Sequence, residues 1–158
     1  MSSFKDMDLL DFNVEREAWL YYTLSDASRF KFKLVLTQVA KSRTHVNPAG
    51  EPIYHYSSTS LFGLVSFPNE LRKPPSTGNV TKKRLMKSLD EQVTFSLDTG
   101  QDTWNVYRFE DETVLKITPV LKSVLRMKLR GPIGEPIYTI NSHQDFRLKV
   151  PSNLVKKP

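Results

Sequence analysis

The side chains with the most chemistry to offer in this chain are cations that recur two residues apart. Lys41, Arg43 and His45 follow one another in a segment where apolar and polar residues alternate. Residues two apart share one side of an extended chain, so these three side chains would form a basic row. Such a row suits the phosphates of RNA or DNA, which bind Lys and Arg whatever the base sequence.

A second basic row, formed by Arg126, Lys128 and Arg130, aligns with the first. Two related rows, joined by cations elsewhere in the chain, could follow a nucleic-acid backbone. The competing interpretation is that these charges protect exposed strand edges and keep the protein soluble. The predicted nucleic-acid-binding residues are Lys31, Lys33, Lys41, Arg43, Lys82, Lys83, Arg84, Lys116, Arg126, Lys128 and Arg130.

The formal net charge of +6 is unevenly distributed along the 158 residues. Residues 1–17 carry −3, residues 18–75 carry +4, residues 76–103 carry 0 and residues 104–158 carry +5. The excess positive charge therefore lies on the two segments that contain the basic rows, which favours a polyanionic partner.

Arrangements typical of catalysis or metal binding are scarce. The three histidines, His45, His55 and His143, have none of the spacings at which paired ligands hold a metal ion. The sequence has no Cys, and no GxSxG motif marks a serine nucleophile. We therefore expect a protein that is not an enzyme and that needs no metal or cofactor.

Four acidic residues recur in pairs, and each pair has a structural explanation. Asp26 and Asp111 lie in short polar segments that read as hairpin turns, where Asp is favoured. Glu51 and Glu135 lie in two copies of GEPIY, in which Gly and Pro lead the chain into a strand. The alternative is that a small ligand binds near Glu51 or Glu135.

The two GEPIY segments, at 50–54 and 134–138, belong to a longer internal repeat. Their flanks also match, for example Trp19 with Trp104 and Phe62 with Phe146. We predict a flexible start over residues 1–7, β repeat 1 over 8–75, a connector over 76–90 and β repeat 2 over 91–158.

Within each unit the hydrophobic pattern has a period of two, as in Phe30, Phe32, Leu34 and Leu36. This pattern predicts a mainly β protein in which each unit is an antiparallel meander of three to four strands. One such meander rarely buries enough apolar surface to be stable. We therefore expect the tandem units to pack about a pseudo-two-fold axis as one small barrel or sandwich.

Several positions refine this expectation. The connector at 76–90 is predicted to be a short helix or an ordered loop, since its charges oppose the helix dipole. Pro119 stands where the first unit has Leu34, and it predicts a strand edge, a bulge or a break. Trp19 and Trp104 open matched strands and are expected to anchor the core.

Composition limits the class of protein further. Hydrophobic residues make up 39% and charged residues 25%, which is typical of a folded domain. No apolar run is long enough for a membrane span, and the first residues are acidic, unlike a signal peptide. These features predict a cytoplasmic protein with no membrane partner.

Taken together, the residues predict a non-enzymatic module that binds RNA or DNA phosphates through two pseudo-symmetric basic rows. The alternative is a protein-interaction or scaffold subunit of a larger complex. Such a subunit would dock through its strand edges or through the acidic segment from Asp6 to Glu17.

Overall fold

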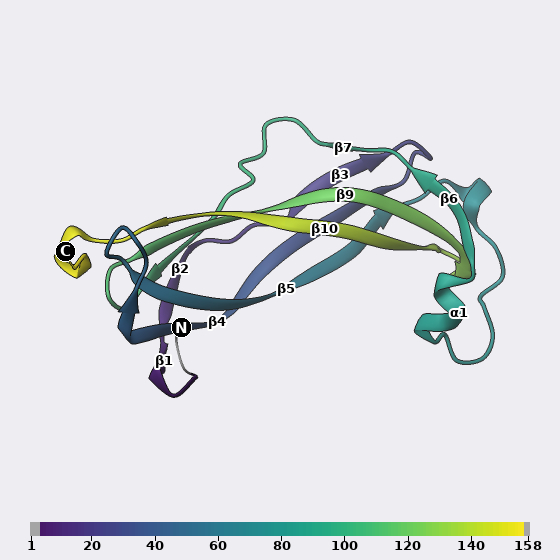
Figure 1. The fold of residues 1–158 in the computed structure, drawn as a ribbon. Coiled ribbons are helices and arrows are strands. Elements are labelled where there is room, and N and C mark those ends of the chain that lie inside the picture. The colour runs from purple at the N-terminus through teal and green to yellow at the C-terminus, as the bar shows by residue number, and fades with distance from the viewer. Residues whose placement is uncertain (1–3, 157–158) are drawn as a thin grey trace.

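The computed structural model describes residues 4–156 and is mainly β, with two antiparallel sheets that we call sheet A and sheet B (Figure 1). Residues 1–3 of the predicted flexible start, and the last two residues of the predicted second repeat, lie outside the described part. None of the described helices is long and apolar enough to cross a membrane. The helical segments are 3-10 turns at Phe4–Asp6, Asn69–Leu71 and Ser152–Leu154, and α1 at Lys82–Met86.

Sheet A is built around one long strand, β4, which has β5 along one side. Its other side is shared, because β3 pairs with the first part of β4 and β1 pairs with a later part. The strands of sheet A are β1 (Met7–Leu10), β3 (Leu20–Leu24), β4 (Arg29–Val46), β5 (Pro52–Ser66) and β7 (Phe95–Leu97).

Sheet B has the same plan around β9. Strand β10 runs along one side of β9, while β8 and β6 share the other side. The strands of sheet B are β2 (Phe12–Arg16), β6 (Leu89–Val93), β8 (Asn105–Phe109), β9 (Val114–Arg130) and β10 (Pro136–Lys149).

Each half of the chain gives one strand to the sheet of the other half. Strand β2 follows β1 after the single residue Asp11, yet it pairs with β8 of sheet B. Strand β7 follows β6 after Thr94 and pairs with β3 of sheet A. The sequence predicted that each meander would pair only its own strands, and this exchange was not predicted. Hydrophobic alternation shows which face of a strand is buried, but it does not specify the strand with which it pairs.

The predicted alternation in the first long strand is confirmed. Phe30, Phe32, Leu34 and Leu36 are all buried on one face of β4. Leu115, Ile117 and Leu121 are buried in β9 in the same way. Because side chains alternate between the faces of a strand, the intervening residues of β4 lie mostly on the outer face.

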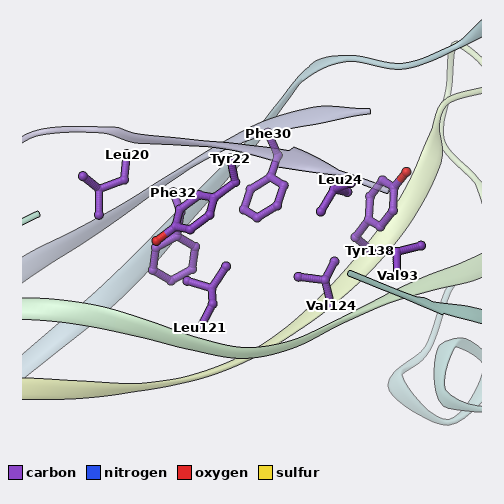
Figure 2. Close-up of a cluster of buried hydrophobic side chains, with 9 residues drawn as sticks. All are labelled: Leu20, Tyr22, Leu24, Phe30, Phe32, Val93, Leu121, Val124 and Tyr138. Carbon is purple, nitrogen blue, oxygen red and sulfur yellow. The ribbon is translucent and has the colours of Figure 1, made fainter. Parts of the chain in front are cut away.

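Apolar side chains from both sheets meet in two clusters. Figure 2 shows the first, where Tyr22 and Phe30 of sheet A lie opposite Leu121 and Val124 of sheet B. The second joins β4 to β8 and β9, with Tyr107 fully buried. In residues 4–156 the strands form two open sheets and no closed barrel, because β5 pairs only with β4 and β10 only with β9.

The structure agrees with the prediction for Pro119 and differs from the prediction for the two tryptophans. Pro119 lies within β9, between the stretches that pair with β8 and with β6, where β9 has only β10 as a partner. The local strand edge predicted for a proline is therefore present. The predicted core role of Trp19 and Trp104 is wrong, because both side chains are half-buried and belong to neither apolar cluster.

Both GEPIY segments form the same tight turn. Gly50 and Gly134 have positive φ angles of 82° and 83°, a region that favours glycine. A Cβ atom at Gly50 would lie 2.1 Å from the carbonyl oxygen of Lys156, and one at Gly134 would lie 2.6 Å from that of Lys73. The end of each half thus packs against the turn of the other half, which leaves no room for a side chain.

Candidate nucleic-acid interface

Asp111 shows how the structure uses a cation from the first predicted row. Asp111 lies in the turn between β8 and β9, and its Oδ2 is 2.8 Å from Lys41 Nζ. The Tyr54 hydroxyl donates to the same oxygen at 2.6 Å. Burial alone raises the pKa of Asp111, but hydrogen bonds from Lys41, Tyr54 and Thr113 outweigh it, so the pKa lies below its usual value. Lys41 is therefore already paired.

Asp26 has the corresponding place in the turn between β3 and β4. Its Oδ2 is 3.0 Å from Arg126 Nη1 and accepts a hydrogen bond from the Tyr138 hydroxyl at 2.6 Å. Burial raises the pKa of Asp26, but the hydrogen bonds from Tyr138, Ser28 and Arg126 together lower it below its usual value. The two turn aspartates, read from sequence as local turn residues, therefore also connect the two halves.

Arg126, another predicted contact, is surrounded by acidic side chains. Besides Asp26, its guanidinium group meets Asp90 at 3.0 Å and Glu91 at 2.8 Å, and Arg126 as a whole is only 9% exposed. Burial lowers the pKa of Arg126, and hydrogen bonds to these carboxylates raise it more. Three acids around one buried guanidinium leave no positive charge for a polyanion.

Arg130 is also unsuited to surface contact, since it is 3% exposed. Its guanidinium group donates to the carbonyl oxygens of Leu71 and Met127, each at 2.9 Å. It therefore holds the end of β9 against the segment that follows β5. With Arg126 and Arg130 buried and Lys128 exposed, the second predicted row does not form a continuous surface.

The end of the first row is neutralised by β1 and by the turn before it. Arg43 Nε lies 3.3 Å from Asp8 Oδ2 and 4.0 Å from Asp6 Oδ1. His45 Nδ1 lies 2.7 Å from Asp6 Oδ2. Hydrogen bonds from Ser42 and His45 hold the pKa of Asp6 well below its usual range, so this carboxylate stays charged beside them.

Lys31 and Lys33 lie on the outer face of sheet A and share one aromatic neighbour. The ammonium group of Lys31 lies 4.6 Å from the centre of the Trp19 ring, and that of Lys33 lies 5.7 Å from it. Lys33 also forms an ion pair with Glu17 at 3.3 Å. An ammonium group held over an indole ring already has a favourable electrostatic partner. Lys31 and Lys33 are therefore less available to a further anion.

A different group of cations gathers where α1 meets β9. Lys83, Arg84, Lys87 and Lys128 line a surface hollow of about 520 Å³, together with Thr81, Ser88 and Leu129. No carboxylate is among these lining residues. Lys128 thus joins the connector's cations, separated from its buried neighbours in β9.

Local hydrogen bonds explain why α1 and β9 hold this position. The Thr81 hydroxyl caps the helix by accepting a hydrogen bond from the Arg84 N–H at 3.1 Å. The Lys128 N–H donates to the carbonyl oxygen of Ser88, which fastens the end of the helical segment to β9. The Arg84 guanidinium donates to the carbonyl oxygen of Asn79 at 3.3 Å, so it is oriented along the preceding loop.

Lys116 lies apart from this group, in a second hollow of about 520 Å³ on sheet B. There Arg108 is paired with Glu15, and the Arg147 guanidinium lies 4.7 Å from the centre of the Trp104 ring. Glu15 and the Trp104 ring thus engage two of the four cations that line this hollow, the other two being Lys116 and Lys149. Unlike the hollow at α1 and β9, it has a carboxylate among its lining residues.

The structure brings together only part of the predicted set. Lys83, Arg84 and Lys128 line one hollow, and Lys82 belongs to the same helix without lining it. The two hydroxyls of the hollow, Thr81 and Ser88, were not predicted. Thr81 had a recognisable signal, because a Thr before a helical segment is a typical N-cap residue.

Comparisons with protein-family models, with curated proteins and with solved structures each found no match. Among residues 4–156, no three His, Asp or Glu side chains gather as a metal site.

Proposed function

We propose that this protein is a non-enzymatic module that binds the phosphates of RNA or DNA at the junction of α1 and β9. The observation that carries the proposal is the gathering of four cations, Lys83, Arg84, Lys87 and Lys128, in one hollow without a lining carboxylate. The proposal keeps the class of partner predicted from sequence and narrows the contact surface from two rows to one site.

The chemistry of the hollow fits a phosphate backbone better than a base. Lysine ammonium groups are mobile point charges that bind phosphates in many geometries. The Thr81 and Ser88 hydroxyls add polar groups of the kind that often contact phosphate oxygens. Binding through such groups is weakly sequence-specific. With four contacts, the slope of log affinity against log salt concentration is roughly −3 to −4.

We further propose that the two halves are a tandem duplication packed as a sandwich about a pseudo-two-fold axis. Equivalent strand pairings support this proposal: Leu10 pairs with Val39 as Val93 pairs with Val124. The reciprocal networks of Asp26 and Asp111, each bound by cation and tyrosine from the other half, support it as well. A cytoplasmic location stays a prediction from composition.

Fluorescence anisotropy with labelled single-stranded RNA, single-stranded DNA and duplex DNA, each at several salt concentrations, tests the binding function. The wild-type chain should bind at low salt and lose affinity with the slope given above. The absence of binding to all three probes at low salt would contradict the proposal.

A charge-reversal triple variant localises the contact. Lys83→Glu/Lys87→Glu/Lys128→Glu should weaken binding at least tenfold, because it reverses three of the four cations in the hollow. The matched control reverses three exposed lysines elsewhere, Lys73, Lys122 and Lys156. Each variant changes the net charge from +6 to 0. Equal losses in both would show that only total charge matters.

A further inference from the structure

Strand β5 has a long free edge. It contains 15 residues and pairs with β4 alone in the part of the chain that the structure describes. At about 3.4 Å per residue, its edge extends for about 50 Å. Backbone N–H and C=O groups on such an edge are able to pair with another strand.

The sequence of β5 lacks the charges that usually protect an edge. No Asp, Glu, Lys or Arg occurs between Pro52 and Ser66. Strand β10, the matching edge of sheet B, is different, although both edges are long. At aligned positions β5 has Thr59, Leu61, Gly63 and Val65, while β10 has His143, Asp145, Arg147 and Lys149.

Apolar side chains on β5 are also exposed. Leu61, Phe62 and Val65 are 43%, 41% and 42% exposed, respectively. Leu61 and Val65 lie on the outer face and Phe62 on the inner face, because successive residues alternate. An exposed, uncharged and partly apolar edge is the kind that pairs with a further strand.

We propose that β5 pairs with β5 of a second copy of this chain, antiparallel and about a two-fold axis, so that two copies of sheet A become one sheet. This inference is independent of the proposed phosphate site, which lies on β9 and α1. The dimer would be isologous, with the same strand presented by both partners.

The charges around β5 favour a second copy over a charged partner strand. Lys31 and Lys33, which lie beside β5 on β4, are held by Trp19 and Glu17. They leave little charge at this edge to select an acidic strand. A second β5 is a neutral strand, so no charged side chains of β5 meet in any register, and the +6 of each copy is not concentrated at the contact.

Molar mass in solution tests the proposal with the full chain. Light scattering after size exclusion, or sedimentation, should give twice the 18.2 kDa of the chain at micromolar concentration. The variant Leu61→Asp/Val65→Lys places on β5 the residues that β10 carries at the aligned positions, and it should be monomeric. The matched control Asn141→Asp/His143→Lys adds the same two charges to β10 and should stay dimeric.

A wild-type monomer up to high micromolar concentration would overturn the proposal, as would a dimer unaffected by Leu61→Asp/Val65→Lys. Isolation of the native chain with one stoichiometric foreign protein on β5, and no self-association, would also overturn it.

Single cysteines give a second measurement if the charged variant does not fold. The chain has no Cys, so an introduced thiol is the only one. Mild oxidation of Ser57→Cys, Thr59→Cys or Leu61→Cys should produce a covalent dimer for at least one position. His143→Cys on β10 should not. Failure of all three β5 cysteines to cross-link above the level of His143→Cys contradicts the pairing.

Discussion

The ends of β4 and β9 differ in what their neighbouring strands supply, although their basic residues align. At the end of β4, the segment before and within β1 supplies Asp6 and Asp8, which neutralise Arg43. At the end of β9, β6 supplies Asp90 and Glu91, but both are taken by the buried Arg126. The cations of α1 then lie beside Lys128 in a hollow that has no acid among its lining residues.

The strand that pairs beside each basic row, β1 or β6, and not the row itself, determines whether the cations of the row are free of acids. From sequence alone, the basic rows at the ends of β4 and β9 look equally available to a ligand. In the structure, ion pairs with Asp6 and Asp8 neutralise the end of β4, and the end of β9 has a basic hollow.

Replacing the central cation of each turn-aspartate network should lower the free energy of unfolding of the chain by different amounts. Arg126→Met leaves Asp26 buried without its cation and should lower the free energy of unfolding by about 3 kcal/mol. Lys41→Met at the aligned position should lower it by about 1 kcal/mol, because Lys41 is more exposed and faces one acid. Urea unfolding measures both. Equal losses would contradict the contrast.

Lowering the pH should remove the contribution of the two turn carboxylates, Asp26 and Asp111, to the stability of the fold. The pKa of Asp26 and of Asp111 is lower in the folded chain than in the unfolded chain, so each stabilises the fold at neutral pH. This contribution is lost as the pH falls below about 4, the unfolded value, and through the folded pKa. The wild type should therefore lose stability on acidification.

The variants Asp26→Asn and Asp111→Asn should each show a shallower acid loss and a lower stability at pH 7, by about 1 to 2 kcal/mol. Thermal or urea unfolding at several pH values between 7 and 3 provides the measurement. An acid loss in either variant as steep as that of the wild type would show that its carboxylate is not the titrating group.

Removing the hydroxyl of either GEPIY tyrosine should cost the same stability, whereas replacing Arg126 and Lys41 should not. Each hydroxyl donates to a turn aspartate at 2.6 Å, Tyr54 to Asp111 and Tyr138 to Asp26. Tyr54→Phe and Tyr138→Phe should therefore each lower the free energy of unfolding by about 1 kcal/mol. A large difference between the two variants would argue against equivalent networks.

The smallest effect is expected at the exposed end of the first row. Arg43 has a side chain that is 59% exposed and pairs with Asp8 on the surface. Arg43→Met should change the free energy of unfolding by no more than about 0.5 kcal/mol. It should also leave nucleic-acid affinity within about twofold. A tenfold loss of affinity would place the interface at the end of β4.

Part of the fold could be predicted from residues alone. Alternation in Phe30 to Leu36 predicted a half-buried strand, and the GEPIY segments predicted the turns at Gly50 and Gly134. The exchange of β2 and β7 between sheets could not be predicted. It depends on single-residue links at Asp11 and Thr94 that direct the chain to a strand of the other half.

The candidate site was predicted less well than the fold. A period of two indicates which residues share a face of a strand. It does not show that Arg126 meets acids from the β3–β4 turn and from β6, which are distant in sequence. Lys128 was singled out for its place in a row. Its structural neighbours include Lys83 and Arg84 of α1, which were predicted as contacts but not as neighbours of Lys128.

The most direct test of this contrast is a map of amide chemical shifts on adding a short single-stranded oligonucleotide to the isotope-labelled chain. We expect the largest changes at Thr81 to Ser88 and at Lys128, with little change at Lys41 to His45. Changes centred on Lys41 to His45, or none at either end at low salt, would contradict the assignment of phosphate binding to the junction of α1 and β9.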